Sequence, residues 1–176
     1  NNTLVDSNRL VALYLTNVVG SAMLGTQSTA GLLIVDDDCY LQFSAANYSV
    51  DEYARTVEVT VQRVGGTVHP VQVDFASSNL TAIAGKDYVA GRGTVSFTGE
   101  AYVPATNNPG VLVLRPGEAS RSIEFRVLDD VLGEGNEDFL VTLSKARTTA
   151  SVPLGTVTLG AQTNTVVTIL DNETPG

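Results

Sequence analysis

The sequence has few of the residues on which disulfide-stapled proteins and most metalloenzymes depend. Its 176 residues include one cysteine (Cys39), one histidine (His69) and no tryptophan. A lone cysteine excludes a disulfide within the chain and a cysteine-based metal cluster. A lone histidine argues against a zinc site with several histidine ligands and against catalysis that needs more than one histidine. Since no nucleophile–base pair is visible either, we predict that the chain is not an enzyme.

Long apolar runs are missing as well. Apolar runs such as those at residues 31–35 and 111–114 are far shorter than the roughly 20 residues that span a bilayer. We therefore expect no direct membrane insertion. The chain also lacks a methionine start and a basic-then-apolar leader, so Asn1 is expected to be an internal start of a processed or longer protein.

Positive charge is scarce. Ten Lys and Arg residues stand against 19 Asp and Glu residues, which gives a formal net charge of −9. Such a chain repels nucleic acids and anionic membranes, so neither is an expected partner, whereas cations are attracted. Because 43% of the residues are hydrophobic, the chain is not a disordered acidic tail and can form a core.

The dominant pattern that is present is strict alternation of apolar and polar residues, which is typical of half-buried antiparallel strands. Turn signals such as Gly65-Gly66 and Pro116-Gly117 separate the segments, and no helical periodicity exceeds a turn or two. About seven short strands with such turns predict an all-β fold, a β-sandwich. The alternating segments are residues 56–62, 71–75, 94–97, 123–127 and 139–143.

The chain also repeats itself. Residues 24–36 match residues 159–171, and residues 8–15 match residues 136–143. We predict that residues 1–38 are the trailing hairpin of one repeat, that 39–173 are the complete next repeat, and that 174–176 are a tail. A repeat of domain size indicates a tandem array, and the missing linker predicts a stiff junction.

Acidic residues stand at the expected strand ends. If strands at 121–128, 138–146 and 163–170 form a meander, the acidic residues that follow them meet at one end of the sandwich. The same counting treats 55–64 and 68–77 as a hairpin and brings two earlier acidic residues to that end. The gathered set is Glu52, Asp87, Asp129, Asp130, Glu134, Glu137, Asp171 and Glu173.

Clustered carboxylates require positive charge, because two charges ~4 Å apart repel by ~4 kcal/mol at an effective dielectric constant of ~20. Calcium accepts about six to eight oxygen ligands in flexible geometry. One ion cannot neutralise the whole set, so the pattern predicts Ca²⁺ as the cofactor, with two or more ions that share carboxylates. The alternative is that the acidic residues only solvate strand ends.

Several segments resemble the Calx-β family, a module of sodium–calcium exchangers and of many extracellular adhesion proteins. The resemblance covers 39–173 throughout and 1–38 as a partial copy. It rests mainly on Ala-Gly-Lys-Asp-Tyr at 84–88 and on Asp-Asp…Glu-x-x-Glu-x-Phe at 129–139, closed by Ile-Leu-Asp at 169–171. It implies an immunoglobulin-like antiparallel β-sandwich with calcium sites at one end.

The resemblance also implies a role for each metal ligand. Asp129 and Asp130 would bridge ions, and Leu132 would offer its carbonyl oxygen. The remaining ligands would be the carboxylates of Glu52, Asp87, Glu134, Glu137 and Asp171, with Glu173 in support.

Three departures from the family pattern stand out. Asp171-Asn172-Glu173 replaces an acidic triplet, which removes one charged ligand. An insertion near 98–110 is expected to be a long hairpin or loop that either carries contacts or is merely tolerated. In the first copy Arg9 stands where Glu137 stands in the second, and a cation there opposes calcium. The upstream site is therefore expected to bind fewer ions or none, and the alternative role of the triplet at 36–38 is to cap the junction with the next module.

Three functions remain open. The first is a calcium-binding structural or adhesive module of a tandem-repeat protein, extracellular or at the cell surface, whose partners are neighbouring repeats or other protein subunits. The second is a carbohydrate- or protein-binding module that acts through the 98–110 insertion. The third is an intracellular calcium sensor. Four Asn-x-Ser/Thr sites, at Asn1, Asn47, Asn79 and Asn172, predict a glycoprotein if the source is a secretory eukaryote.

Overall fold

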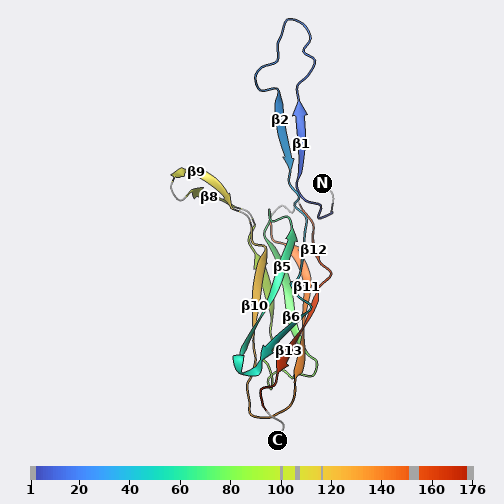
Figure 1. Ribbon diagram of the computed structural model, residues 1–176, viewed down its shortest axis with the longest axis vertical. Helices are drawn as coiled ribbons and strands as arrows, with labels where there is room; N and C mark the ends of the chain where they lie inside the picture. The colour runs from blue at the N-terminus through green and yellow to red at the C-terminus, as the bar shows by residue number, and fades with distance from the viewer. Residues whose placement is uncertain (1–2, 100, 106–107, 116, 151–154, 174–176) are drawn as a thin grey trace.

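The computed structural model describes residues 3–99, 101–105, 108–115, 117–150 and 155–173, with the backbone alone for 101–105 and 108–115. Two sheets pack face to face into a β-sandwich (Figure 1). The four-stranded sheet runs in the order β10 (Ser120–Arg126), β5 (Thr56–Gly65), β3 (Cys39–Phe43), β12 (Val157–Leu159). The five-stranded sheet runs β4 (Asn47–Asp51), β13 (Asn164–Leu170), β11 (Glu137–Thr148), β6 (Val71–Asn79), β7 (Arg92–Phe97).

The predicted all-β sandwich is confirmed. Most pairings are antiparallel, and two short ones are parallel, β12 with β3 and β13 with β4. The only helix among the described residues is the 3₁₀ turn η1 (Glu52–Ala54), and no described helix could cross a membrane.

Alternation along the strands builds the core. In β5, Val57, Val59 and Val61 are buried while Glu58 stays exposed. Fully burying a side chain of this kind contributes about 1.5–3 kcal/mol, so the alternating phase of each strand fixes which face turns inward.

An aromatic stack closes the core near the acidic end, the end of the sandwich at which Glu52, Asp87, Glu134, Glu137, Asp171 and Glu173 lie. The rings of Tyr88 and Phe139 stack with centroids 4.2 Å apart, and Phe125 packs edge-on against Phe139. The hydroxyl of Tyr88 donates a 2.8 Å hydrogen bond to Oδ1 of Asn79. These contacts fix the backbone next to Asp87, which directly precedes Tyr88, and next to Glu137, which lies two residues before Phe139.

Two topological predictions are wrong. β5 and β6 do not form a hairpin, because β5 pairs with β3 and β10 whereas β6 pairs with β11 and β7. β10 likewise pairs with β5 and forms no meander with β11 and β13. Period-two alternation reports which face of a strand is buried and not which strand lies beside it. The predicted convergence of loops survives, since a crossing between sheets reverses the chain as a hairpin does.

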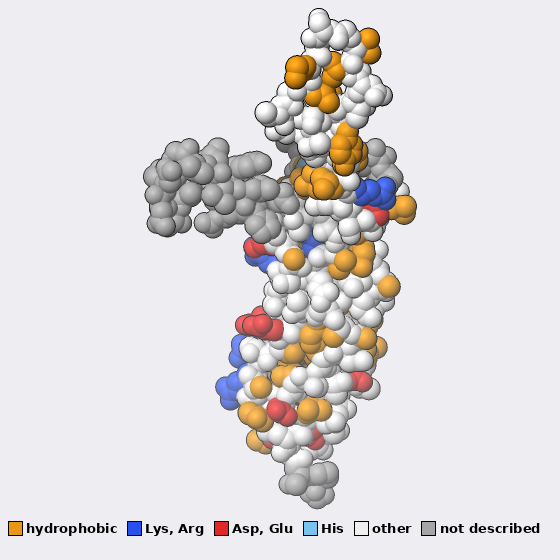
Figure 2. Space-filling model, turned by 45° about the horizontal axis from the view of Figure 1, so that its top comes forward, with side chains coloured by type: hydrophobic (Ala, Val, Ile, Leu, Met, Phe, Trp, Pro, Cys, Tyr) orange, Lys and Arg blue, Asp and Glu red, His pale blue; other side chains and the backbone are white. Residues whose placement is uncertain are grey.

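Two hairpins project from the sandwich. β1 (Arg9–Tyr14) and β2 (Thr29–Ile34) extend from the end opposite the C-terminus, and β8 (Ala101–Ala105) and β9 (Asn108–Arg115) project sideways near the same end (Figure 1). The predicted insertion near 98–110 is therefore a hairpin. Apolar side chains gather over the β1–β2 hairpin at the top of the space-filling view (Figure 2).

Candidate metal centre

Five chain segments meet at the end of the sandwich from which the C-terminus leaves (Figure 1). η1 brings Glu52 there ahead of β5, and the loop between β6 and β7 brings Asp87. The loop from β10 to β11 supplies residues 129–136, β11 opens with Glu137, and the segment after β13 supplies Asp171 and Glu173. The predicted acidic residues thus converge, although the strands reach this end by a different topology.

The carboxylates form two clusters of three. Glu52, Asp171 and Glu173 make one cluster, and Asp87, Glu134 and Glu137 make the other. In each cluster the potential ligand oxygens lie within 4.8 Å of one another. Members of both clusters line a single pocket at this end of the sandwich.

The other three predicted ligands lie beside these clusters. The backbone of Asp130 donates a hydrogen bond to the Glu52 carboxylate, and Oδ1 of Asp130 accepts one from the Leu132 amide at 2.7 Å. Oδ2 of Asp129 lies 3.5 Å from Nη2 of Arg55. The role of the Leu132 carbonyl as a ligand stays a prediction.

Local backbone structure presents Asp87 to the site. Gly85 adopts a positive φ of 88°, which an L side chain rarely adopts. The turn that results lets Oδ2 of Asp87 accept a 2.7 Å hydrogen bond from the amide of Ile83. The buried Tyr88 ring then fixes the next residue in the core.

Asp171 is held by backbone donors from the neighbouring loop. Its Oδ2 accepts a 2.7 Å hydrogen bond from the amide of Gly135, and its Oδ1 accepts one from the amide of Glu173. These donors hold the pKa of Asp171 below its usual value. Asp171 is therefore ionised and oriented before any ligand arrives.

The remaining carboxylates are crowded. Burial, a hydrogen bond with Asp87 and the charges of Asp87 and Glu134 raise the pKa of Glu137 to about 7. Burial, followed by repulsion from nearby acidic residues, also raises the pKa values of Glu52 and Glu173. The site holds more negative charge than its surroundings neutralise, which fits a hard divalent cation with oxygen ligands.

Two cations of the site were not predicted from the sequence. Nζ of Lys86 lies 2.5 Å from Oε1 of Glu134 and 3.8 Å from Oδ1 of Asp87, and Arg55 faces Asp129. The position of Lys86, directly before a predicted ligand, was the signal that could have revealed it.

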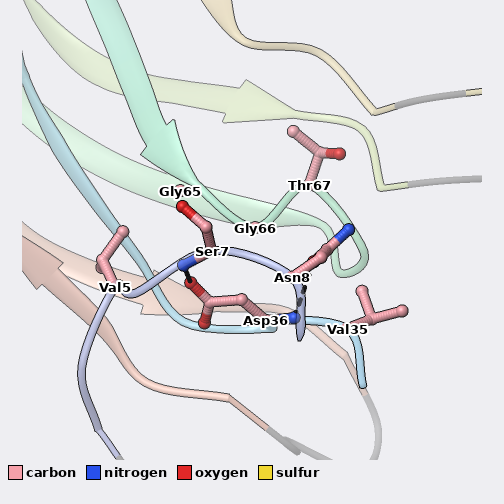
Figure 3. A pocket seen from close by; sticks show the side chains of 8 residues that line it. All are labelled: Val5, Ser7, Asn8, Val35, Asp36, Gly65, Gly66 and Thr67. Carbon is pink, nitrogen blue, oxygen red and sulfur yellow. Dashed lines mark hydrogen bonds between the residues drawn. The ribbon is translucent and has the colours of Figure 1, made fainter. Parts of the chain in front are cut away.

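A third acidic cluster, Asp36, Asp37 and Asp38, lies where the β1–β2 hairpin meets the sandwich. Oδ2 of Asp36 accepts a hydrogen bond from the amide of Asp6 at 2.8 Å. It accepts a second from the amide of Ser7 at 3.0 Å (Figure 3). Oδ1 of Asp38 accepts one from the amide of Thr156 at 2.6 Å. These bonds use the triplet to cap the junction, which is one of the two roles predicted for it.

Glycines let the junction pack closely. A Cβ atom added to Gly66 would lie 2.4 Å from the carbonyl oxygen of Asp36, and one added to Gly155 would lie 2.2 Å from that of Asp37. The amide of Gly66 donates a 2.8 Å hydrogen bond to the carbonyl of Asp38. The join between hairpin and sandwich is thus built from backbone contacts and not from a flexible linker.

Comparison with known proteins yields one family. The family model of the Calx-beta domain matches residues 35–105 and 98–173. Sodium/calcium exchanger 1 of Rattus norvegicus is 30% identical over 145 residues, which cover 76% of this chain and 13% of that protein. Adhesion G-protein coupled receptor V1 of Danio rerio is 29% identical over 143 residues, which cover 79% of this chain and 2% of that protein. The chain thus spans a small part of the curated relatives that it matches.

Solved structures agree. The apo form of the Calx CBD1 domain superposes with a TM-score of 0.57 at 25% identity, over 76% of this chain and 97% of that one. The calcium binding domain CBD12 of CALX1.1 superposes with a TM-score of 0.53 at 26% identity, over 76% of this chain and 44% of that one.

Proposed function

The chain belongs to the Calx-beta domain family, and from this premise we propose that its acidic end binds calcium ions. The observation that carries the proposal is the pair of three-carboxylate clusters, of whose six members all but Glu173 line one pocket. A related structure is described as a calcium binding domain. The proposal gives the chain a binding role and no catalytic one.

The two clusters divide the ligands between at least two ions. Asp87, Glu134 and Glu137 would hold one ion, and Glu52, Asp171 and Glu173 would hold another. Asp129 and Asp130 adjoin the second cluster, since their charges act on both Glu52 and Glu173. Bound calcium supplies the positive charge that relieves the mutual repulsion of these carboxylates. The chain's own task is to pre-arrange the oxygens, as the backbone donors of Asp171 show.

In our proposal the module serves a tandem-repeat protein outside the cell or at its surface. The similarity to an adhesion receptor supports this role. The described chain ends at Glu173, within the acidic end, so calcium bound there would stiffen this end of the sandwich. A site with a Kd of roughly 10⁻⁴–10⁻³ M suits millimolar extracellular calcium.

The second candidate is a calcium-sensing domain within a cell, which the similarity to sodium/calcium exchanger 1 favours. Affinity separates the two roles, because intracellular sensors bind with a Kd of roughly 10⁻⁷–10⁻⁵ M. Binding of carbohydrate or protein through the insertion near 98–110 stays a prediction, since the side chains of that hairpin lie outside the described residues.

Thermal unfolding tests the calcium proposal. If calcium is present at ten times Kd, linkage adds about 1.4 kcal/mol, which raises Tm by roughly 3–6 °C. EGTA should remove the shift, and Glu134→Gln should reduce it. Glu118→Gln is the matched control, because Glu118 pairs with Arg121 away from the acidic end and should leave the shift intact. An unchanged Tm at millimolar calcium contradicts the proposal. The calcium concentration at half-maximal shift then distinguishes an extracellular module from a sensor.

A further inference from the structure

The β1–β2 hairpin repeats the β11–β13 pair of the sandwich in its strand register. Arg9 lies opposite Ile34, as Glu137 lies opposite Ile169, and the match continues through six residue pairs to Tyr14 opposite Thr29. These correspondences follow the offsets of the sequence repeat, 128 residues for the first strand (from 8 to 136) and 135 for the second (from 24 to 159). The sequence similarity is therefore also a similarity of pairing.

The loop beside the hairpin repeats the hydrogen bonds of the acidic end. Oδ2 of Asp36 accepts from the amide of Ser7, as Oδ2 of Asp171 accepts from that of Gly135. The amides of Asp36 and Asp171 donate to Oδ1 of Asn8 and of Asn136, respectively.

The backbone conformation of the two loops is also the same. Ser7 has a φ of 71° where Gly135 has 80°. A serine rarely adopts this conformation, so the loop at Ser7 has the same unusual geometry as the glycine-containing loop at Gly135. At the other end of the strands, the amide of Leu15 donates to the carbonyl of Ser28, as the amide of Leu143 donates to that of Thr163.

One face of the hairpin has the apolar character of a core without being covered. In β11 and β13 the buried face carries Phe139, Val141, Leu143, Thr165, Val167 and Ile169. The corresponding hairpin positions are all apolar and all exposed: Val11, Leu13, Leu15, Ala30, Leu32 and Ile34. Leu13 is 48% exposed, and Leu32 and Ile34 are 51% exposed. A contiguous exposed apolar surface of this kind normally marks an interface.

Both edges of the hairpin are also open. Among the described residues, β1 and β2 pair only with each other. In the sandwich the outer edge of β11 pairs with β6 in antiparallel fashion, and the outer edge of β13 pairs with β4 in parallel. An isolated two-stranded hairpin is marginally stable in water, so the hairpin requires partners for its edges as well as for its face.

We propose that the Val11 face of the hairpin docks against the leading strands of a preceding Calx-beta repeat, located ahead of β1 in the same polypeptide. β1 pairs along its free edge with the counterpart of β6, and β2 pairs with the counterpart of β4. The hairpin then completes that repeat's sandwich, whose acidic end rests on the Gly65–Gly66 turn of this one. The interface does not depend on calcium, because Arg9 replaces Glu137 at the acidic end of the hairpin and pairs with Asp6.

Hydrogen exchange on an extended chain tests this docking. A second copy of residues 39–128, which correspond to the segment ahead of residue 1, is fused in front of Asn1 of the complete chain. The fusion is made in two forms, one with Val11 and one with Val11→Phe. Val11 corresponds to Phe139, which stacks on Tyr88, so the phenylalanine fills the space that valine would leave beside the second copy of Tyr88. The amides of β1 and β2 are expected to exchange at least ~10-fold more slowly than in the chain of 176 residues. Unchanged exchange in both fusions overturns the proposal.

Two further measurements test the face and the identity of the occupant. Val11→Asp should abolish the added protection and Leu10→Asp, on the opposite face of β1, should retain it. Equal loss in both variants overturns the assignment of the face. Sedimentation of the chain of 176 residues should show a monomer. A dimer with a protected hairpin overturns the proposal in favour of a second copy as the occupant.

Discussion

Lys86 and Glu134 form an ion pair inside the acidic end, with 2.5 Å between Nζ and Oε1. The same ammonium lies 3.8 Å from Oδ1 of Asp87, so a cation of the chain occupies the edge of a cluster proposed to hold calcium. Because Lys86 directly precedes Asp87, it is tethered at high local concentration. Calcium must displace this ammonium to gain both carboxylates.

Removal of that tethered cation should strengthen calcium binding. We expect Lys86→Met to lower the calcium Kd by roughly fivefold, since an exposed ion pair is worth up to about 1 kcal/mol. Arg121→Met removes the same charge at the start of β10, where the arginine pairs with Glu118, and should leave Kd nearly unchanged. Calorimetric titration of both variants measures the difference. An equal effect of the two substitutions would mean that only net charge matters.

Stability of the calcium-free chain should fall as the pH rises from about 4.5 to about 7. The pKa of Glu137 is near 7 in the folded chain, against 4.5 for an ordinary glutamate. The folded state therefore binds more protons than the unfolded state in this window, and the free energy of unfolding decreases with pH. Glu52 and Glu173 act in the same direction.

Asp171 acts in the opposite direction but at lower pH. Its folded pKa lies below the ordinary 3.8, so its contribution is present above that value and is lost as the pH falls through the folded pKa. Urea denaturation between about pH 4.5 and 8 in EGTA should show the decline, and Glu137→Gln should flatten it. A stability that rises across this range would refute the assignment.

Gly66→Ala should destabilise the junction. The added Cβ would lie 2.4 Å from the carbonyl oxygen of Asp36, and overpacking of this kind costs about 1–3 kcal/mol. Gly25→Ala is the matched control, because its Cβ meets nothing within 4 Å. Urea denaturation compares the two. Equal free energies of unfolding would show that the close backbone contact at the junction has no consequence.

The aromatic stack should matter far more than the hydrogen bond of its tyrosine. Tyr88→Phe keeps the stack on Phe139 and loses the hydrogen bond to Asn79, at a cost of about 1 kcal/mol. Phe139→Ala removes the fully buried ring and should cost about 3–5 kcal/mol. The free energies of unfolding of the two variants provide the test, and a reversed order would contradict this description of the core.

The strands and their inward faces were well predicted from the sequence, because alternation of apolar and polar residues places the apolar side chains of a strand on one face. The sequence did not predict strand partners. The turn signal Gly65-Gly66 fits a hairpin within one sheet and a connection to the other sheet equally well. Convergence of Asp87, Glu134 and Asp171 was nevertheless predictable, because either connection returns the chain to the same end.

Alternation of apolar and polar residues did not predict the charged residues that lie in the core or at the metal centre. Arg63 continues the inward phase of β5 after Val61 and is only 4% exposed, although arginine is rarely buried. Arg55 and Lys86 were not predicted as members of the site, because their ion pairs with Asp129, Asp87 and Glu134 depend on how the loops fold together.

The most direct test is calorimetric titration of calcium into the chain of 176 residues. Our proposal predicts saturable binding of more than one ion. Glu134→Gln should lower the calcium affinity of the cluster that it forms with Asp87 and Glu137. Asp171→Asn should lower the calcium affinity of the cluster that it forms with Glu52 and Glu173. The double variant should bind no calcium at millimolar concentration. Absence of binding by the unmodified chain at millimolar calcium, or binding that both substitutions leave unchanged, would contradict the proposal that the acidic end is a calcium centre.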